Sequence, residues 1–260
     1  MKEILNEIVE KHLKEYKREI LVNLKKEIDA KLNNMDKPAK GQLTDPDGNE
    51  YTTVVIGDQE WTVENWRSTK YADGTPISKV TDSDEWSSLN TPAYCWYDNT
   101  TNELFRAKYG ALYNWYVISP DNPKDLAPDG WRVPTDADWE ELEDYMIANG
   151  YNWGGSTTYN KIGKALASDG GEWRSTSDKG GVGNDQSSNN SSGFSALPGG
   201  YRRNDGYFSS LIYRGYWWSV PRVNVPDANS RSLNCIYECL RRSHYSKEYG
   251  FSVRLVRDVR

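Results

Sequence analysis

The last quarter of the chain, residues 199–258, reads GGYRRNDGYFSSLIYRGYWWSVPRVNVPDANSRSLNCIYECLRRSHYSKEYGFSVRLVRD and decides what kind of fold the sequence specifies. The aromatic run 215–219 and the alternating apolar and polar residues of 250–257 each predict a strand, the second of them half-buried. Residues 220–246, between them, have neither helical nor strand periodicity. We therefore expect two strands that hold an irregular segment as a binding surface. Because neighbouring side chains of a strand point to opposite faces, one of Trp217 and Trp218 should be buried and the other should line this surface.

The composition indicates a loop-rich domain with an aromatic core. The 260 residues include 11 Trp and 18 Tyr, while the mean hydropathy is only -0.85. Large rings bury much area from few positions, and their polar atoms can satisfy nearby loop backbone. The net charge of -6 argues against nucleic acid as a partner, since nucleic-acid binding needs a basic surface.

The chain divides by pattern into three parts. Residues 1–33 predict an amphipathic helix for oligomerisation or attachment, residues 34–41 a polar linker, and residues 42–260 the main domain. The apolar stripe of the helix drifts, so a strict heptad seam is not present; packing on its own domain stays an alternative to a homo-oligomer, for which a trimer is favoured. The sequence shows neither a signal peptide nor a membrane span, which predicts cytoplasmic synthesis and no insertion into a membrane.

Regular elements are also predicted within the main domain. Residues 52–56 and 60–63 are typical of strands, and residues 104–118, 136–148 and 159–167 of helices. Thr135 is expected to cap the second helix, with Asp136 and Asp138 near its positive end and Trp139, Leu142, Tyr145 and Met146 on its apolar face. The acidic Glu140, Glu141 and Glu143 are interpreted as solvated charge.

The sequence gives only weak support for two possible metal sites. Residues 45–49 have the spacing of the start of a calcium loop, but its closing Glu is missing, so a plain turn is favoured. Cys235 and Cys239 would need further ligands, and the chain has only His12 and His244 to offer. With Cys95 the cysteines are three, too few for a disulfide framework, and we interpret them as surface or half-buried thiols. No metal or cofactor is predicted.

Several sequence motifs follow one another in the order of a known family. They are Ile56-Gly57-x-Gln59-x-Trp61-x-x-Glu64-Asn65, Tyr109-Gly110-x-Leu112-Tyr113-Asn114-Trp115, Gly130-Trp131-Arg132-Val133-Pro134-Thr135, 193–202 (GFSALPGGYR), Tyr216-Trp217-Trp218-Ser219 and Gly250-Phe251-Ser252-Val253-Arg254. Over residues 42–258 the chain resembles the Fibrobacter succinogenes major paralogous domain. The resemblance implies an α+β domain of C-type-lectin-like fold, in the version shared with formylglycine-generating enzymes, with two main helices, small twisted antiparallel sheets and long loops.

The resemblance also implies two kinds of binding protein. Some members of the family are bacterial surface proteins, and others are variable proteins of diversity-generating retroelements, often of phage. In the latter, adenine-directed mutagenesis rewrites codons that never yield Lys, Glu, Gln, Met or Trp, and in 220–246 only Glu238 belongs to this excluded set. We therefore expect a non-enzymatic receptor-binding protein on a phage tail, located in the virion. A bacterial surface adhesion protein without diversification, its signal segment removed, and an ordinary irregular loop stay open as alternatives.

Two further function classes fit the motifs less well. In formylglycine-generating enzymes a copper-binding cysteine pair precedes an Arg-rich strand, whereas Cys235 and Cys239 follow Ala228 and Arg231. Calcium-dependent lectins carry Glu-Pro-Asn or Gln-Pro-Asp with Trp-Asn-Asp, and none of these tripeptides occurs in the chain. No catalytic residue is therefore predicted.

The candidate binding surface covers about residues 216–246 and would contact a protein or glycan on a target cell. Ala228, Leu233 and Leu240 should point inward, while the ligand-binding side chains should gather, exposed, on one side of the domain. The predicted ligand-binding residues are Tyr213, Tyr216, Val220, Arg222, Val223, Val225, Pro226, Asn229, Ser232, Asn234, Cys235, Ile236, Tyr237, Arg241, Ser243, His244 and Tyr245.

Overall fold

A computed structural model describes residues 40–220 and 228–259 of the chain. The contacts between residues divide the chain into two compact units, Met1–Lys37 and Pro38–Arg260. The second unit is an α+β fold with short helices and small sheets of antiparallel and mixed pairing. The predicted helix 1–33 and most of the predicted linker lie outside the described residues. Within the described part, no helix has the length and apolarity needed to cross a membrane.

The helices are few and the strands are short. The described helices are α2 (Ser83–Ser87), α3 (Glu103–Tyr109), α4 (Asp136–Ala148) and α5 (Gly163–Leu166). The strands are β1 (Lys40–Thr44), β2 (Glu50–Ile56), β3 (Gln59–Thr62), β4 (Ser78–Lys79), β5 (Ala93–Cys95), β6 (Leu112–Tyr113), β7 (Gly199–Arg202), β8 (Phe208–Leu211), β9 (Arg214–Ser219), β10 (Ala228–Asn234), β11 (Arg241–Tyr245) and β12 (Val256–Asp258).

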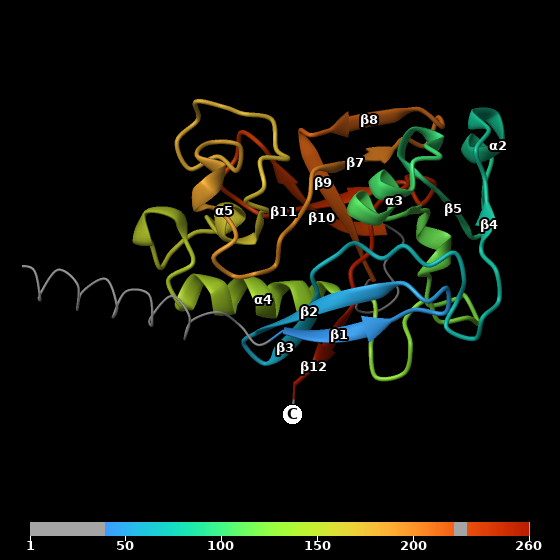
Figure 1. The fold of residues 1–260 in the computed structure, drawn as a ribbon, viewed down its shortest axis with the longest axis horizontal. Coiled ribbons are helices and arrows are strands. Elements are labelled where there is room, and N and C mark those ends of the chain that lie inside the picture. The colour runs from blue at the N-terminus through green and yellow to red at the C-terminus, as the bar shows by residue number, and fades with distance from the viewer. Residues whose placement is uncertain (1–39, 221–227, 260) are drawn as a thin grey trace, which may run out of the picture. The chain divides into compact units, whose positions relative to one another are not determined.

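The first and last described strands belong to the same four-stranded sheet, of order β1-β2-β3-β12 (Figure 1). Its strands β2 and β3 confirm the predicted pair to within two residues. The turn before β2 is also as predicted: the Asp45 carboxylate accepts the backbone N–H of Asp47 and of Asn49, each at 2.9 Å. Such a side-chain-to-backbone bond is the reason Asp favours turns.

The five-stranded sheet, of order β11-β10-β9-β7-β8, corrects the expectation of an irregular segment at 220–246. Of that segment, β10 and β11 are regular antiparallel strands, and all seven residues of β10 are buried. The periodicity of β10 is hidden because the strand has cover on both faces, so polar Ser, Asn and Arg side chains are buried beside Leu233. Figure 1 shows this sheet with α4 below β10 and β11.

The C-terminal segment is likewise more buried than predicted. Residues 250–256 are all buried, and regular pairing with β3 begins only at Val256. Phe251, Val253 and Leu255 pack in one core cluster, whereas Val256 packs in the second. The segment therefore has core on both sides and is not a half-buried strand.

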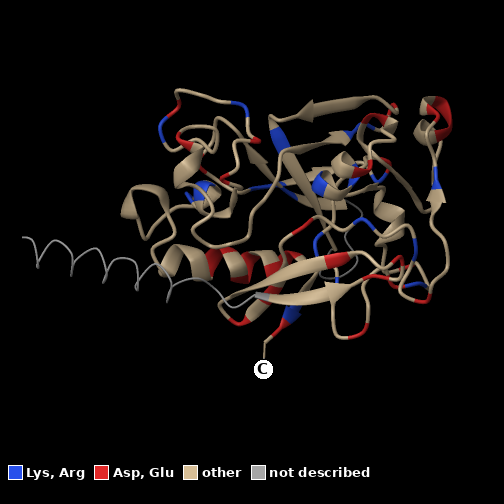
Figure 2. Cartoon of the chain, in the orientation of Figure 1, with Lys and Arg blue, Asp and Glu red and all other residues tan. Residues whose placement is uncertain are grey.

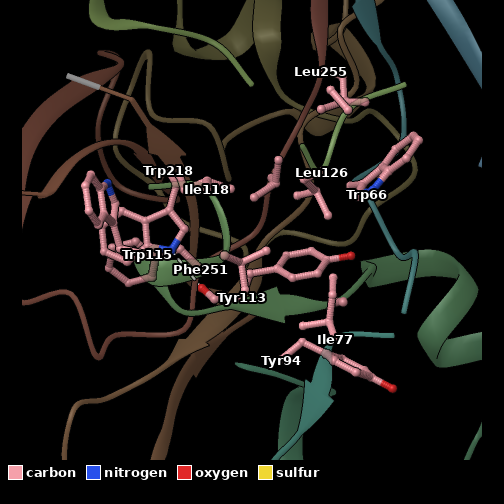
Figure 3. Close-up of a cluster of buried hydrophobic side chains, with 14 of the residues drawn as sticks. Trp66, Ile77, Tyr94, Tyr113, Trp115, Ile118, Leu126, Trp218, Phe251 and Leu255 are labelled. Atoms are coloured by element: carbon pink, nitrogen blue, oxygen red, sulfur yellow. Dashed lines mark hydrogen bonds between the residues drawn. The ribbon is translucent and has the colours of Figure 1, made fainter. Parts of the chain in front are cut away.

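Both tryptophans of β9 are buried, which corrects the expectation that one of them lines a surface. Trp217 and Trp218 do point to opposite faces, as a strand requires, but each face carries a core cluster. The indole N–H of Trp217 donates to Asn65 Oδ1 at 2.8 Å, and that of Trp218 donates to the Tyr113 carbonyl at 2.7 Å. Figure 3 shows Trp218 beside Phe251 and Tyr113.

Helix α4 has the predicted bounds, cap and core face. Trp139, Leu142 and Met146 are buried, while Tyr145 is 37% exposed. The Thr135 hydroxyl accepts the Asp138 N–H, and Asp138 accepts the Thr135 N–H at 2.7 Å, which completes a capping box. The other two helix predictions were too long. In the range 104–118 the helix ends at Tyr109, because Gly110 has φ 76°. In the range 159–167 only Gly163–Leu166 is helical.

The capping box makes the stability of the domain depend on pH. Burial raises the pKa of Asp138, but hydrogen bonds from Arg132 and Thr135 outweigh it, so the pKa lies below its ordinary value. The ionised carboxylate therefore stabilises the fold above pH about 4, and this contribution is lost as the pH falls through the lowered pKa. We expect Asp138→Asn to cost about 1–2 kcal/mol at pH 7. The cost should shrink by pH 3.5.

Urea unfolding at both pH values checks this, with Asp144→Asn as the matched control on the exposed face of the same helix. A cost for Asp138→Asn that is the same at pH 7 and pH 3.5 would contradict the role of the charge.

Candidate functional site

The candidate site is built on β9, β10 and β11, whose register sorts their side chains onto two faces. One face, called the Tyr216 face, carries Arg214, Tyr216, Trp218, Ala228, Ser230, Ser232, Asn234, Arg241, Ser243 and Tyr245. The opposite one, called the Trp217 face, carries Trp217, Ser219, Asn229, Arg231, Leu233, Arg242 and His244. This sorting follows from the alternation of side chains along each strand.

The Trp217 face is fixed to α4 by a buried ionic network. The side chain of Arg231 is 1% exposed, with Nη1 2.7 Å from Asp136 Oδ1 and Nε 3.0 Å from Glu143 Oε1. Asp136 Oδ2 accepts hydrogen bonds from Asn229 and from Arg242, both at 2.5 Å. Figure 2 shows the acidic residues of α4 in red beneath this sheet.

This network corrects the interpretation of Glu143 as solvated charge. Its side chain is 19% exposed and pairs with Arg231. Burial raises the pKa of the Glu143 carboxyl, and the neighbouring Arg231 and Asn160 offset only part of that rise. Since a buried charge that loses its partner is costly, the network holds β10 and β11 in one position against the helix.

The Tyr216 face carries an aromatic cluster that is open on one side. The Tyr216 ring, 3% exposed, is stacked on Phe251 with centroids 4.8 Å apart. Half-buried Tyr201, Tyr245 and Tyr249 surround this pair, and the Tyr245 ring is 5.6 Å from Tyr216. Burial and the hydrogen bond with Tyr216 raise the pKa of Tyr245, so its phenol stays neutral at physiological pH. The small Ser230 and Ser232 between β9 and β11 leave room for Tyr245 to lean across to Tyr216.

The most exposed part of the site is a corner where β9 begins and β10 ends. We call Tyr213, Arg214, Ile236, Tyr237 and Arg241 the corner. Tyr213 is 46% exposed, Ile236 42% and Tyr237 37%. The Arg241 guanidinium lies 4.3 Å above the Tyr237 ring, and the Tyr213 carbonyl accepts the Cys235 N–H at 2.9 Å. The corner therefore offers rings and guanidinium groups to solvent.

The predicted site residues divide by burial into three groups. Tyr213, Ile236, Tyr237, Arg241 and His244 are exposed, and Val220, Ser243 and Tyr245 are half-buried. The expectation of exposure is wrong for buried Tyr216, Asn229, Ser232, Asn234 and Cys235. Arg222, Val223, Val225 and Pro226 lie outside the described residues. The inward positions of Ala228, Leu233 and Leu240 are confirmed.

The predicted residues do not all gather on one side. Asn229 and His244 are paired in register and belong to the Trp217 face, opposite to Ser243 and Tyr245. Three contributors were missed, namely Tyr201, Arg214 and Tyr249. Arg214 could have been predicted from the sequence, because it lies two residues before Tyr216 on the same strand and therefore shares its face.

Two of the three cysteines differ from the prediction of surface or half-buried thiols, and Cys239 confirms it. Cys95 and Cys235 are buried, Cys239 is half-buried, and all three are free. Burial raises the pKa of Cys95 to about 12 and raises that of Cys235. Both stay protonated at pH 7, and a protonated thiol is a poor nucleophile and metal ligand. Among the residues that the structure describes, no three His, Cys, Asp or Glu side chains form a group that could hold a metal ion.

A comparison with known families shows to which family the chain belongs. The sequence model described as Fibrobacter succinogenes major domain matches residues 54–257. The chain belongs to this family. Neither the curated proteins nor the solved structures include a match.

Proposed function

We propose that this chain is a non-enzymatic receptor-binding protein on a C-type-lectin-like scaffold, with a binding surface at residues 213–245. The observation that carries the proposal is the chemistry of the Tyr216 face and the corner. Their exposed or half-buried side chains are Tyr213, Arg214, Ile236, Tyr237, Arg241, Ser243 and Tyr245. Tyr and Arg supply large contact area with directed hydrogen bonds, and Ser adapts to a partner, as in antibody binding sites.

The platform beneath these side chains supports the same proposal. Arg231, Asp136 and Glu143 fix β10 from behind, and Trp217 and Leu233 on the same Trp217 face are fully buried. A binding surface of high affinity needs to be held rigid before its partner arrives, since ordering on binding weakens the complex. The fixed layer lies behind the surface and the adaptable side chains lie on it.

We further propose that this surface is diversified by a retroelement and displayed on a phage tail in the virion, with residues 1–33 forming a homotrimer or an attachment. The position of Glu238 supports diversification of its neighbours. It is the one residue in 220–246 that adenine mutagenesis cannot produce, and it is tied to the domain. Its carboxylate is 3.1 Å from Lys161 Nζ, and its carbonyl accepts the Gly163 N–H at 2.8 Å. A fixed position among varied ones is expected to have such a structural role.

A bacterial surface adhesion protein of the same family is the alternative, and it would use the same surface without diversification. The two differ in their genetic surroundings and not in the geometry of the domain.

Truncation of a side chain at the corner should weaken binding without unfolding the domain. We expect Tyr237→Ala and Arg241→Ala each to weaken binding to the target cell by about 2 kcal/mol or more, roughly thirtyfold. Their stability should change by about 0.5 kcal/mol or less, because both side chains are exposed. Tyr245→Ala should instead lose both binding and stability, since its ring packs in the aromatic cluster.

The measurements are cell binding and melting temperature for each variant. Tyr207→Ala, at a ring 67% exposed in the turn before β8, is the control and should leave both unchanged. Full binding by folded Tyr237→Ala and Arg241→Ala variants would remove the corner from the binding surface.

A further inference from the structure

Three arginines near one end of the five-stranded sheet have no acceptor that neutralises them. Among the described residues, Arg132, Arg203, Arg231, Arg242 and Arg257 pair with carboxylates, and Arg67, Arg106, Arg202 and Arg254 donate to backbone carbonyls. Arg174, Arg214 and Arg241 do neither. Arg214 donates only to the Tyr216 hydroxyl, and Arg241 only stacks on Tyr237. All three are exposed.

These three arginines lie on segments that meet at the corner. Arg214 is opposite Asn234 in the register of β9 and β10, and Arg241 is opposite Ser232 in that of β10 and β11. Arg174 belongs to a loop beside them: its N–H donates to the Ile212 carbonyl at 2.7 Å, next to Tyr213.

The nearby acids do not pair with these arginines. Asp178, whose charge acts on Cys235 as those of Arg174 and Arg214 do, offsets at most one of the three positive charges, and Glu238 is paired with Lys161 at 3.1 Å. Within the described residues, three guanidinium groups are thus without a carboxylate partner, although the net charge of the chain is -6. Such a local potential attracts an anionic partner and repels a cationic one.

We propose that the partner of the corner is a protein surface whose carboxylates lie beside an apolar group. The inference rests on the proposed function and names the class of its ligand. Each guanidinium fork matches a carboxylate in a bidentate pair. The Tyr237 ring lies against the Arg241 guanidinium, and Tyr213 and Ile236 are the exposed chain neighbours of Arg214 and Tyr237. These side chains favour an apolar neighbour. Ile236 offers no hydrogen bond to a sugar, so an acidic protein fits the corner better than an acidic glycan.

The test uses the full chain and three polymers as probes: a random Glu–Tyr copolymer, polylysine and polygalacturonate. We expect the Glu–Tyr copolymer to bind, and its Kd to rise about tenfold or more between 0.05 and 0.5 M NaCl as the charges are screened. Polylysine, which the net charge of -6 attracts to other faces of the domain, is the control for charge alone, and the Arg→Gln substitutions described below should not weaken its binding. Binding of polygalacturonate with equal or higher affinity would overturn the choice of a protein partner in favour of an acidic glycan.

Substitutions of the three arginines test whether the copolymer binds at the corner. The triple variant Arg174→Gln, Arg214→Gln, Arg241→Gln should lose copolymer affinity by tenfold or more. The triple Arg→Lys variant at the same positions should keep part of it, because the charge remains. A control variant, Lys79→Gln, Lys108→Gln, Lys124→Gln, removes the same charge elsewhere and should bind as the unaltered chain does. Lys108 and Lys124 pair with Glu172 and Asp73, so binding is measured well below the melting temperature of each variant. Equal losses in the control and the Gln variant would overturn a role specific to the corner.

The two proposals fail differently. If Tyr237→Ala abolishes binding to target cells while the triple Gln variant retains it, the acidic partner is wrong and the binding surface stands. If neither the tyrosine nor the arginine variants affect cell binding, the proposed function itself fails.

Discussion

Asp136→Asn is expected to lower the stability of the domain by about 3 kcal/mol or more, the largest effect of any single polar substitution proposed for this chain. The Asp136 carboxylate is buried and receives Arg231, Arg242, Asn229 and Ser219 at 2.5–3.0 Å. Its neutral isostere would leave the buried guanidinium of Arg231 with Glu143 alone. The amide group would also bring N–H donors to a place where every partner is itself a donor.

The matched control is Glu140→Gln on the same helix. Glu140 also pairs with Arg242, at 3.3 Å, but both side chains are about half exposed, so the expected cost is about 0.5 kcal/mol or less. Urea unfolding of both variants measures the difference. Equal costs for Asp136→Asn and Glu140→Gln would show that the network does not hold the sheet to α4.

Trp217→Ala and Trp218→Ala are each expected to cost about 3–5 kcal/mol, because both rings are fully buried. Each substitution also leaves a buried acceptor without its indole donor, Asn65 Oδ1 for Trp217 and the Tyr113 carbonyl for Trp218. Trp153→Ala, at a ring 40% exposed, is the control and should cost much less. Thermal unfolding compares the three variants.

A small loss for one of the two β9 variants would restore the original expectation that one ring lines the surface. The informative result is therefore whether Trp217→Ala and Trp218→Ala lose a similar amount of stability.

The sequence predicts best those elements whose local signals agree. Helix α4 has a capping residue, acidic first-turn residues and an apolar stripe, and its bounds were predicted to the residue. The pair β2 and β3 has residues of high strand propensity, Thr, Val, Ile and Trp, on both sides of a tight turn. Local signals and the global fold coincide at these positions, so the local signals alone are sufficient.

The sequence fails where burial depends on distant partners. Arg231 lies in a strand whose polar residues indicate a surface, yet it is buried because Asp136 and Glu143, nearly a hundred positions earlier, neutralise it. In β10 the Ser, Asn and Arg residues hide the alternation, and no local signal reports the ionic network that permits them. The unpaired state of Arg174 and Arg214 is also invisible in sequence, because it is defined by which carboxylates the fold places elsewhere.

The measurement that tests the central proposal most directly is the sequence of the DNA that flanks the coding region. The proposal predicts an adjacent reverse transcriptase and a template repeat that differs from the coding copy only at adenines of the template. The differing codons should encode residues of the binding surface such as Ile236, Tyr237, Arg241, Ser243 and Tyr245. They should spare the platform residues Trp217, Leu233 and Glu238. Absence of such a repeat, or differences concentrated on the platform residues, would contradict a diversified binding surface.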